Sequence, residues 1–205
     1  MTYEDPTFAT SASAIPRMKV NVVENNDKPF FTVDEWYSPE ELISVWKELD
    51  FYTDFKKLSY SEDQTLQLNL GDVYKEDNNI SDILSFQYKE KLELFANQVQ
   101  RSFTPEKLDE FLNIKSTKTI VRYFHNGMKQ ETNTHDSKFT SVCFLRKADT
   151  YDGGDMILEK FKVKDHNTRL VFFPSDYEYN IETILFKDAT KMVGAGLYTI
   201  TTYYY

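Results

Sequence analysis

The sequence is poor in the residues that build disulfides and metal clusters. It contains one cysteine, Cys143, and three histidines, His125, His135 and His166, in 205 residues. A single cysteine excludes an intramolecular disulfide and any cysteine-rich metal site, and it is typical of a protein that stays in a reducing compartment. No serine, cysteine and histidine form a recognisable nucleophile and base. The sequence therefore excludes zinc fingers and disulfide-stapled scaffolds.

Basic clusters and long apolar runs are also missing. Lys and Arg total 24 against 33 Asp and Glu, which gives a formal net charge of −9 at pH 7. An acidic surface repels phosphate groups, so we expect no binding to nucleic acid or to an anionic membrane. No stretch approaches about 18 consecutive apolar residues, and acidic and polar residues follow Met1. We therefore expect no transmembrane helix and no secretion through a signal peptide.

Large apolar side chains are plentiful, with 16 Phe, 14 Tyr and 2 Trp available to fill a core. The length suits one domain, since domains usually have roughly 100–200 residues. We expect a single domain over residues 19–205, preceded by an arm over residues 1–18. The arm is rich in Ser, Thr, Ala and Pro and has no apolar periodicity. It is either an unstructured terminus or an assembly element that lies on other protein subunits.

The first half of the chain predicts short strands followed by helices. Strands are expected at 19–23, 29–33 and 65–70, and helices from Ser38, over 81–103 and over 105–112. The clearest helix start combines Ser38 as N-cap, Pro39 at the first helical position and Glu41 three residues after the cap. These apolar helix faces predict core packing, and we attach no function to them.

Beyond residue 116 the pattern changes to β and stays there. Strands are expected at 118–124, 139–146, 156–161, 168–173, 179–185 and 197–204, separated by turns that contain Gly, Pro and Asp. Several short strands with turn signals between them are typical of a sandwich or a barrel. The predicted fold class is therefore α+β, a jelly roll with two or three helices packed on one sheet.

Five segments of this β half occur in an order that resembles a known family. They are Ile120–Tyr123, Phe139–Leu145, Tyr151–Leu158 with its Gly153-Gly154 pair, Leu170–Ser175 and Gly194–Thr201. This order resembles the prolyl-4-hydroxylase-like branch of the 2-oxoglutarate and iron(II)-dependent oxygenases. The segment Phe30–Leu42 resembles the strand and helix that open many of these domains. The resemblance implies a double-stranded β-helix over about residues 19–205, of a short type that is common in tailed phages of marine bacteria.

The resemblance also implies where a metal site would lie. The family holds iron(II) with a His-x-Asp pair on one strand and a later His, and it binds oxoglutarate through an Arg on the last strand. The matching metal positions are Asn133, His135 and Asn180, and the matching cosubstrate positions are Leu197 and Tyr123. An amide is a poor iron ligand, and a leucine cannot hold a carboxylate. The metal and cosubstrate positions are therefore degenerate.

One weak metal candidate remains at His135, which is followed directly by Asp136. Adjacent residues on an extended strand face opposite sides, so this pair would need a sharp bend. A rebuilt site would also need a further carboxylate, such as Asp176 or Glu178.

Two functional hypotheses follow. The first is a non-catalytic oxygenase-fold protein without a cofactor, serving as a structural or interaction component of an oligomeric phage assembly such as a neck or tail. Such a protein would be found in the virion or the host cytoplasm. The alternative is an active hydroxylase with displaced metal ligands, which would need iron(II) and 2-oxoglutarate. The sequence leaves open whether the protein is an enzyme, and the degenerate positions favour the first hypothesis.

Overall fold

The structure, a computed structural model, describes residues 19–23, 28–54, 59–60, 66–70, 91, 94–133, 135–146, 151–188 and 196–205. Its helices are α1 (Pro39–Asp54) and α4 (Pro105–Leu112), and residues 94–99 are also helical. The large sheet contains β1 (Lys19–Val23), β2 (Phe30–Asp34), β3 (Ser59–Tyr60), β4 (Leu66–Asn69), β5 (Thr117–Phe124), β7 (Phe139–Arg146), β11 (Leu170–Pro174) and β14 (Leu197–Tyr204). The small sheet contains β6 (Gln130–Asn133), β9 (Met156–Leu158), β10 (Phe161–Val163) and β12 (Tyr179–Ile181). A third pair joins β8 (Tyr151–Asp152) to β13 (Leu185–Phe186).

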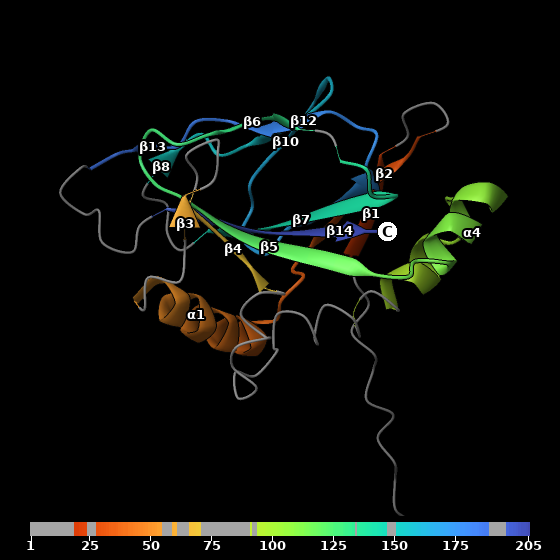
Figure 1. The fold of residues 1–205 in the computed structure, drawn as a ribbon, viewed down its shortest axis with the longest axis horizontal. Helices are drawn as coiled ribbons and strands as arrows, with labels where there is room; N and C mark the ends of the chain where they lie inside the picture. Colours follow the sequence, from red (N-terminus) through yellow and green to blue (C-terminus); the bar gives the residue numbers. More distant parts are fainter. Residues whose placement is uncertain are drawn as a thin grey trace, which may run out of the picture.

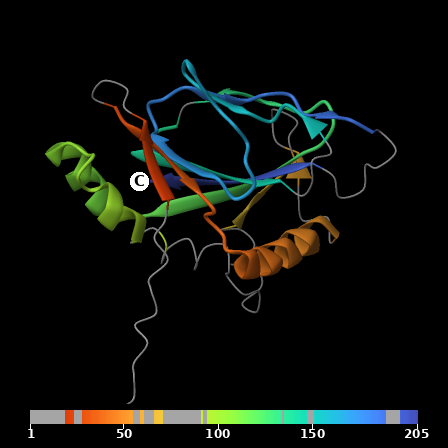
Figure 2. The ribbon, with the colours of Figure 1, turned by 180° about the vertical axis from the view of Figure 1, so that it is seen from behind.

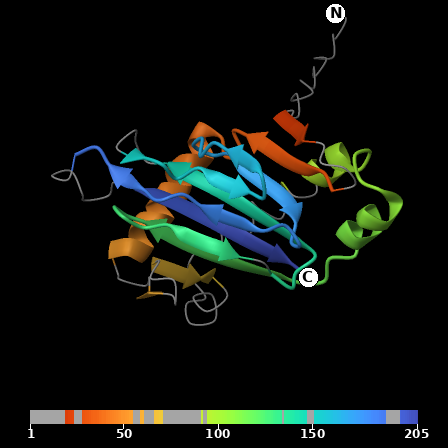
Figure 3. The same ribbon diagram turned by 90° about the horizontal axis from the view of Figure 1, so that it is seen from above.

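The two larger sheets face each other and form the barrel of the jelly roll (Figure 1). The large sheet has the order β1-β2-β11-β7-β14-β5-β4-β3, and the small sheet has the order β10-β9-β12-β6. The chain passes between them as it advances, from β5 to β6 to β7 and later from β11 to β12 to β14. Figure 3 shows the strands of the small sheet lying over those of the large sheet. The fold is therefore α+β with a double-stranded β-helix, as the sequence predicts.

Helices cover the face of the large sheet that is turned away from the small sheet. Figure 2 shows α1 along this face and α4 near the end of the sheet where the C-terminus lies. Phe111 of α4 packs edge to face on Phe172 of β11, with ring centroids 5.4 Å apart. Val45 and Leu49 of α1 join the same core. We call this layer the outer core.

The start of α1 follows from its sequence. The Glu41 N–H donates to Ser38 Oγ at 3.2 Å, and the Ser38 N–H donates to Glu41 Oε2 at 2.7 Å. This reciprocal pair satisfies two backbone donors that a helix start leaves without intrahelical partners. The predicted capping box is therefore confirmed. No helix in the described part of the chain is long and apolar enough to span a bilayer.

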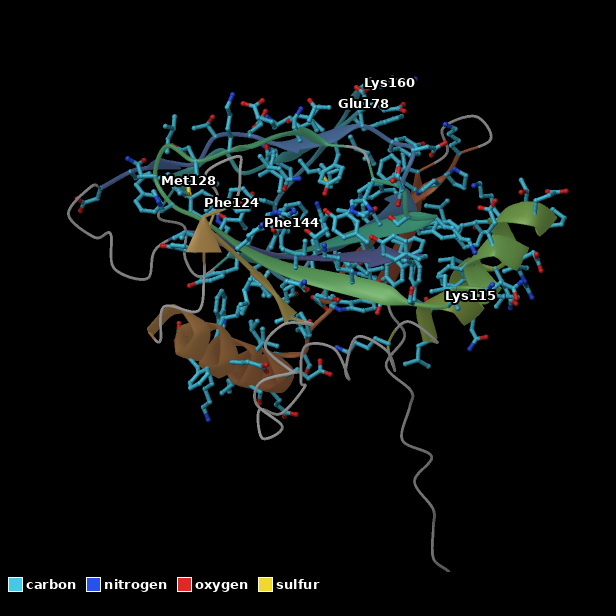
Figure 4. All side chains as sticks on the ribbon, in the orientation of Figure 1. Lys115, Phe124, Met128, Phe144, Lys160 and Glu178 are labelled. Carbon is cyan, nitrogen blue, oxygen red and sulfur yellow. The ribbon has the colours of Figure 1, made fainter. Side chains whose placement is uncertain are left out.

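A second core, the inner core, fills the space between the two sheets. Phe124, Phe144 and Leu197 of the large sheet meet Met156 and Ile181 of the small sheet there. Figure 4 labels Phe124 and Phe144 in this space, among the side chains that fill it. Because strand residues alternate between faces, β2, β5, β7, β11 and β14 each contribute side chains to both cores.

The structure corrects several predicted strands. The predicted strand 156–161 is the hairpin β9–β10, which turns at Glu159, where φ is 51°. The predicted strand 179–185 divides into β12 and β13, which belong to different sheets. Strand β6 has no counterpart in the sequence prediction. Residues 94–99 confirm part of the predicted helix 81–103, whose residues 81–90 and 92–93 lie outside the described residues, as does the arm.

Candidate functional site

The barrel interior is apolar at one end and polar at the other. Phe124 and Leu197 form a cross-strand pair at the apolar end. The next pair that faces the interior is Arg122 and Thr199, followed along β14 by Thr201. The polar end contains six buried residues, each no more than 6% exposed, which we call the polar interior cluster: Arg122, Gln130, Tyr179, Thr199, Thr201 and Tyr203.

The phenol groups of Tyr179 and Tyr203 connect the two sheets within this cluster. Their hydroxyl oxygens lie 3.5 Å apart, and Arg122 Nη2 donates to the Tyr203 hydroxyl at 3.4 Å. Burial, and then the neighbouring Tyr203, raises the pKa of Tyr179 well above its usual value. The Gln130 amide lowers the pKa of Tyr179, although neither Nε2 nor Oε1 of Gln130 has a hydrogen-bond partner of good geometry. Tyr179 is therefore a neutral donor near neutral pH.

His135 lies against this cluster at its open end. Its imidazole stacks on the ring of Tyr203 with centroids 3.9 Å apart, and its Nδ1 lies 3.4 Å from the Tyr205 hydroxyl. Burial lowers the pKa of His135 below its usual value, and the positive charges of Lys118 and Arg122 lower it further against the opposing charge of Asp136. The packing of His135 on Tyr203 thus favours the neutral imidazole.

The metal positions Asn133 and Asn180 lie on neighbouring strands of the small sheet. The backbone of Asn133 pairs with Tyr179 at the end of β6. Asn180 lies between Tyr179 and Ile181, which are both buried in the inner core. Since neighbouring strand residues face opposite sides, the Asn180 side chain is directed away from the barrel interior. The position matched to the later His therefore faces the wrong side of its strand for a metal site shared with His135.

The two cosubstrate positions also lie apart. Leu197 is fully buried in the inner core, whereas Tyr123 is in the outer core with its ring 4.6 Å from that of Tyr198. The register pairs Tyr123 with Tyr198 and Phe124 with Leu197, so the two positions belong to opposite faces of the sheet. The register therefore places the Tyr123 side chain on the face of the sheet opposite to Leu197. Burial raises the pKa of Tyr123 to about 12.

The carboxylates considered for a rebuilt metal site lie at the surface. Asp136 and Glu178 are exposed, and Figure 4 places Glu178 on the outside of the small sheet. Asp176 forms an ion pair of 2.6 Å with Lys28. In the part of the chain that the structure describes, no three His, Cys, Asp or Glu side chains gather as a metal-binding group. The side chains of His135, Asn180 and Leu197 therefore do not fit an iron(II) and oxoglutarate site.

A second group of charged side chains lies beyond the apolar end of the barrel, around a pocket of about 540 Å³. Arg146 Nη1 donates to both carboxylate oxygens of Asp165 at 2.9 and 3.0 Å, and the Tyr151 hydroxyl donates to Asp165 Oδ2 at 2.7 Å. Burial raises the pKa of Asp165 in spite of these partners. Burial acts in the same direction on Asp155, but the hydrogen bonds from Lys164 and the Asp165 amide outweigh it and leave its pKa below the usual value. Within this group Arg146 and Tyr151 pair with Asp165, and Lys164 pairs with Asp155.

The sequence analysis did not identify the polar interior cluster as a site. Arg122 lies in the segment Ile120–Tyr123, whose sequence indicates no role for it, and Gln130 lies on β6, which the sequence does not predict. One available signal was the pair Thr199 and Thr201, two threonines at alternate positions of β14 on either side of Ile200. That spacing predicts a polar stripe on a single sheet face.

The fold is a double-stranded β-helix, as in solved 2-oxoglutarate and iron(II)-dependent oxygenases. Several solved prolyl hydroxylases share it. A prolyl-4-hydroxylase from Pseudomonas putida superposes with a TM-score of 0.61 and 12% identity, over 85% of this chain and 91% of that one. A Phytophthora capsici prolyl 4-hydroxylase gives a TM-score of 0.60 and 14% identity, over 87% of this chain and 59% of that one.

A viral protein is also similar. The collagen prolyl hydroxylase of Paramecium bursaria Chlorella virus-1, solved with 2-oxoglutarate, gives a TM-score of 0.53 and 11% identity, over 85% of this chain and 93% of that one. No family model matches the sequence, and no curated protein matches it. At these low identities the similarity shows the fold alone.

Proposed function

We propose that this chain is a non-catalytic oxygenase-fold protein that serves as a structural or interaction component of a larger assembly, such as a phage neck or tail. The observation that carries the proposal is the packing of His135. The face of its imidazole is stacked on Tyr203 and its Nδ1 is near the Tyr205 hydroxyl. The one histidine at a family metal position thus acts as a packing element of the barrel.

Two further positions support this proposal. The Asn180 side chain is directed out of the barrel, and Leu197 fills part of the inner core where the family supplies a guanidinium. Metal affinity depends on several donors that converge with suitable geometry. The loss of one metal ligand could be compensated by another donor. Here Asn180 differs from the family's histidine both in its donor group and in the direction of its side chain. The proposal includes no resident cofactor.

The proposed partners are other protein subunits, bound through the arm. The arm includes Tyr3, Phe8 and Ile15, which are apolar anchors in a segment too polar to form its own core. It leads into β1, an edge strand that pairs with β2 on one side only in the described sheet. Edge strands offer backbone groups to an added strand. The proposed location is the virion or the host cytoplasm, and the similar chlorella-virus protein shows that viruses use this fold.

The test is an anaerobic titration of the full-length protein with iron(II), followed by metal analysis and a succinate-release assay with 2-oxoglutarate. We expect weak, unsaturated iron uptake, no succinate, and no change in the unfolding midpoint, because a ligand stabilises only as far as it occupies the native state. A solved prolyl hydroxylase of the same fold serves as the positive control. One tightly held iron per chain with succinate release would establish the alternative, an active hydroxylase with displaced ligands.

A further inference from the structure

Strand β1 is an edge of the large sheet that is open on one side in the part of the chain that the structure describes. It pairs with β2 along its whole length, and no other described strand lies beside it (Figure 3, red). The outer N–H and C=O groups of β1 therefore have no partner strand among the described residues. Such a row of backbone groups is a template for the addition of another strand.

The other described edges carry features by which proteins prevent unwanted strand pairing. Strand β3 is only two residues long. On β10, Lys162 forms an ion pair of 2.7 Å with Glu182, and on β6 Glu131 pairs with Lys129 at 2.6 Å. Short strands and charged side chains of this kind discourage the addition of a strand. Strand β1 differs, because it is rich in valine and its single charge, Lys19, stands at its first position.

The side chains of β1 also leave an apolar surface open. Val20 packs against the outer core and Val23 against the inner core. Val22 lies on the same face as Val20, and it is 39% exposed although its cross-strand partner Phe31 is fully buried. An added strand would cover Val22 and satisfy the outer backbone groups of β1 at the same time. The edge therefore suits an extended, uncharged segment.

One segment of the arm has this composition. Residues 7–15 read Thr-Phe-Ala-Thr-Ser-Ala-Ser-Ala-Ile and contain no charged residue, no Gly and no Pro, whereas Pro6 and Pro16 stand at their two ends. An extended segment of this length covers about 30 Å, which is enough to pair with every residue of β1. Because it is uncharged, it is not repelled by a chain whose net charge is −9.

The sequence disfavours the return of this segment to the edge of its own copy. Only residues 16–18, Pro-Arg-Met, separate it from Lys19. A three-residue hairpin loop needs a left-handed residue, usually Gly, and none of these three residues suits that conformation. The link from β1 to β2 differs, since residues 25–27 are Asn-Asn-Asp and favour turns. A parallel return would need a crossover of about a dozen residues or more.

We propose that β1 of one copy of the chain accepts residues 7–15 of a second copy as an added strand. This inference rests on the proposed role of the arm, and it names the partner as a second copy and the binding site as β1. Backbone hydrogen bonds hold the added strand, and its side chains cover Val22. Because each copy carries both an arm and an open edge, such contacts generate a ring or a filament when they pass from copy to copy. Both forms suit a component of a neck or a tail.

The test measures self-association of the full-length chain by sedimentation equilibrium without metal. We expect the wild type to associate and Val22→Lys to associate about ten-fold more weakly, because this variant places a charge on the edge and loses the burial of a valine. Ile43→Lys is the matched control and should associate as the wild type does, since Ile43 is a 59% exposed residue of α1. Equal losses in the two variants, or a wild type that stays monomeric, would overturn the inference.

A second experiment separates the arm from other occupants of the edge. The double variant Ser11→Pro and Ala12→Pro removes two adjacent backbone donors, one of which must point to the edge because successive N–H groups of a strand alternate in direction. We expect it to associate as weakly as Val22→Lys. A mixture of the two should recover association, since one supplies an intact edge and the other an intact arm. Wild-type association of the double variant would overturn the arm as the occupant and would indicate direct pairing of two β1 strands.

Hydrogen exchange of the wild type gives a readout that does not depend on the folding of any variant. Exchange at residues 19–23 should slow as the protein concentration rises, and unchanged exchange would overturn the inference. The non-catalytic role is tested separately by iron uptake and succinate release, which these variants should not alter. Failure of the strand contact would leave association with different subunits as the proposed function, whereas one tightly held iron with succinate release would reject that function and not the strand contact.

Discussion

The imidazole of His135 lies face to face on the phenol ring of Tyr203, with centroids 3.9 Å apart and ring planes 18° apart. Tyr203 is only 1% exposed and belongs to the inner wall of the barrel. His135 therefore covers a buried ring, and its burial and the positive charges of Lys118 and Arg122 favour the neutral imidazole. The histidine that the sequence associates with metal binding is coupled to the stability of the fold.

This coupling predicts a pH dependence of stability. The folded-state pKa of His135 is lowered from 6.5, so the unfolded chain binds more protons as the pH falls through that value. The free energy of unfolding should therefore rise with pH in this range and be lost on acidification. His135→Phe, which keeps a ring on Tyr203, should flatten this part of the profile in urea unfolding at several pH values. His125→Asn is the control and should keep the wild-type slope, whereas an unchanged slope in His135→Phe would contradict the prediction.

Two glycines test the role of backbone space. Gly127 and Gly153 both have φ of +82°, but an added Cβ would lie 1.9 Å from the Thr183 carbonyl oxygen at Gly153 and would meet nothing within 4 Å at Gly127. Gly127→Ala should lower the free energy of unfolding by about 1–2 kcal/mol, because alanine is strained in a left-handed backbone conformation. Gly153→Ala should lower the free energy of unfolding by about 1–3 kcal/mol more than Gly127→Ala does, because the backbone must move to relieve the overlap. Urea unfolding of both variants measures the difference, and equal losses would contradict the steric explanation.

The capping box of α1 predicts a local stability effect. Ser38→Ala removes the side-chain acceptor of the Glu41 N–H and should lower the free energy of unfolding by about 1 kcal/mol. Ser44→Ala, within the same helix, is the matched control. It should have little effect or stabilise slightly, since alanine is the better helix former. Comparable losses in the two variants would show that the cap does not contribute.

Deletion of residues 2–18 tests the proposed role of the arm. The truncated domain should fold with an unchanged thermal midpoint, because the segment is too polar to contribute a core of its own. Self-association or incorporation into a larger assembly should be weakened, as measured by analytical ultracentrifugation. Replacement of Tyr3, Phe8 and Ile15 by serine removes the apolar anchors at constant length and should have the same effect. An unfolded truncation, or one that assembles as the full chain does, would contradict the assembly role.

Much of the fold could be predicted from the sequence, because its signals are local. The capping residues Ser38 and Glu41 set the start of α1, and alternation along β5, β7 and β14 marked strands whose observed bounds agree to within a residue. The order of turns and strands indicated the jelly roll. Hairpin β9–β10 was predicted as one strand, because its turn at Glu159-Lys160 contains no Gly, Pro or Asn.

The site depended on the tertiary structure. The sequence by itself determined which residue types occupy the family positions, and so it showed that Asn180 and Leu197 lack the donors of an oxygenase. Only the folded barrel decided that Asn180 is directed outward, that Tyr123 lies on the outer face of the large sheet and that the Arg122 side chain is buried. The reason is that the local sequence does not distinguish the two faces of a strand when both are buried. The pairing register and the closure of the two sheets decide which face becomes the interior, and a shift of one residue exchanges the two faces.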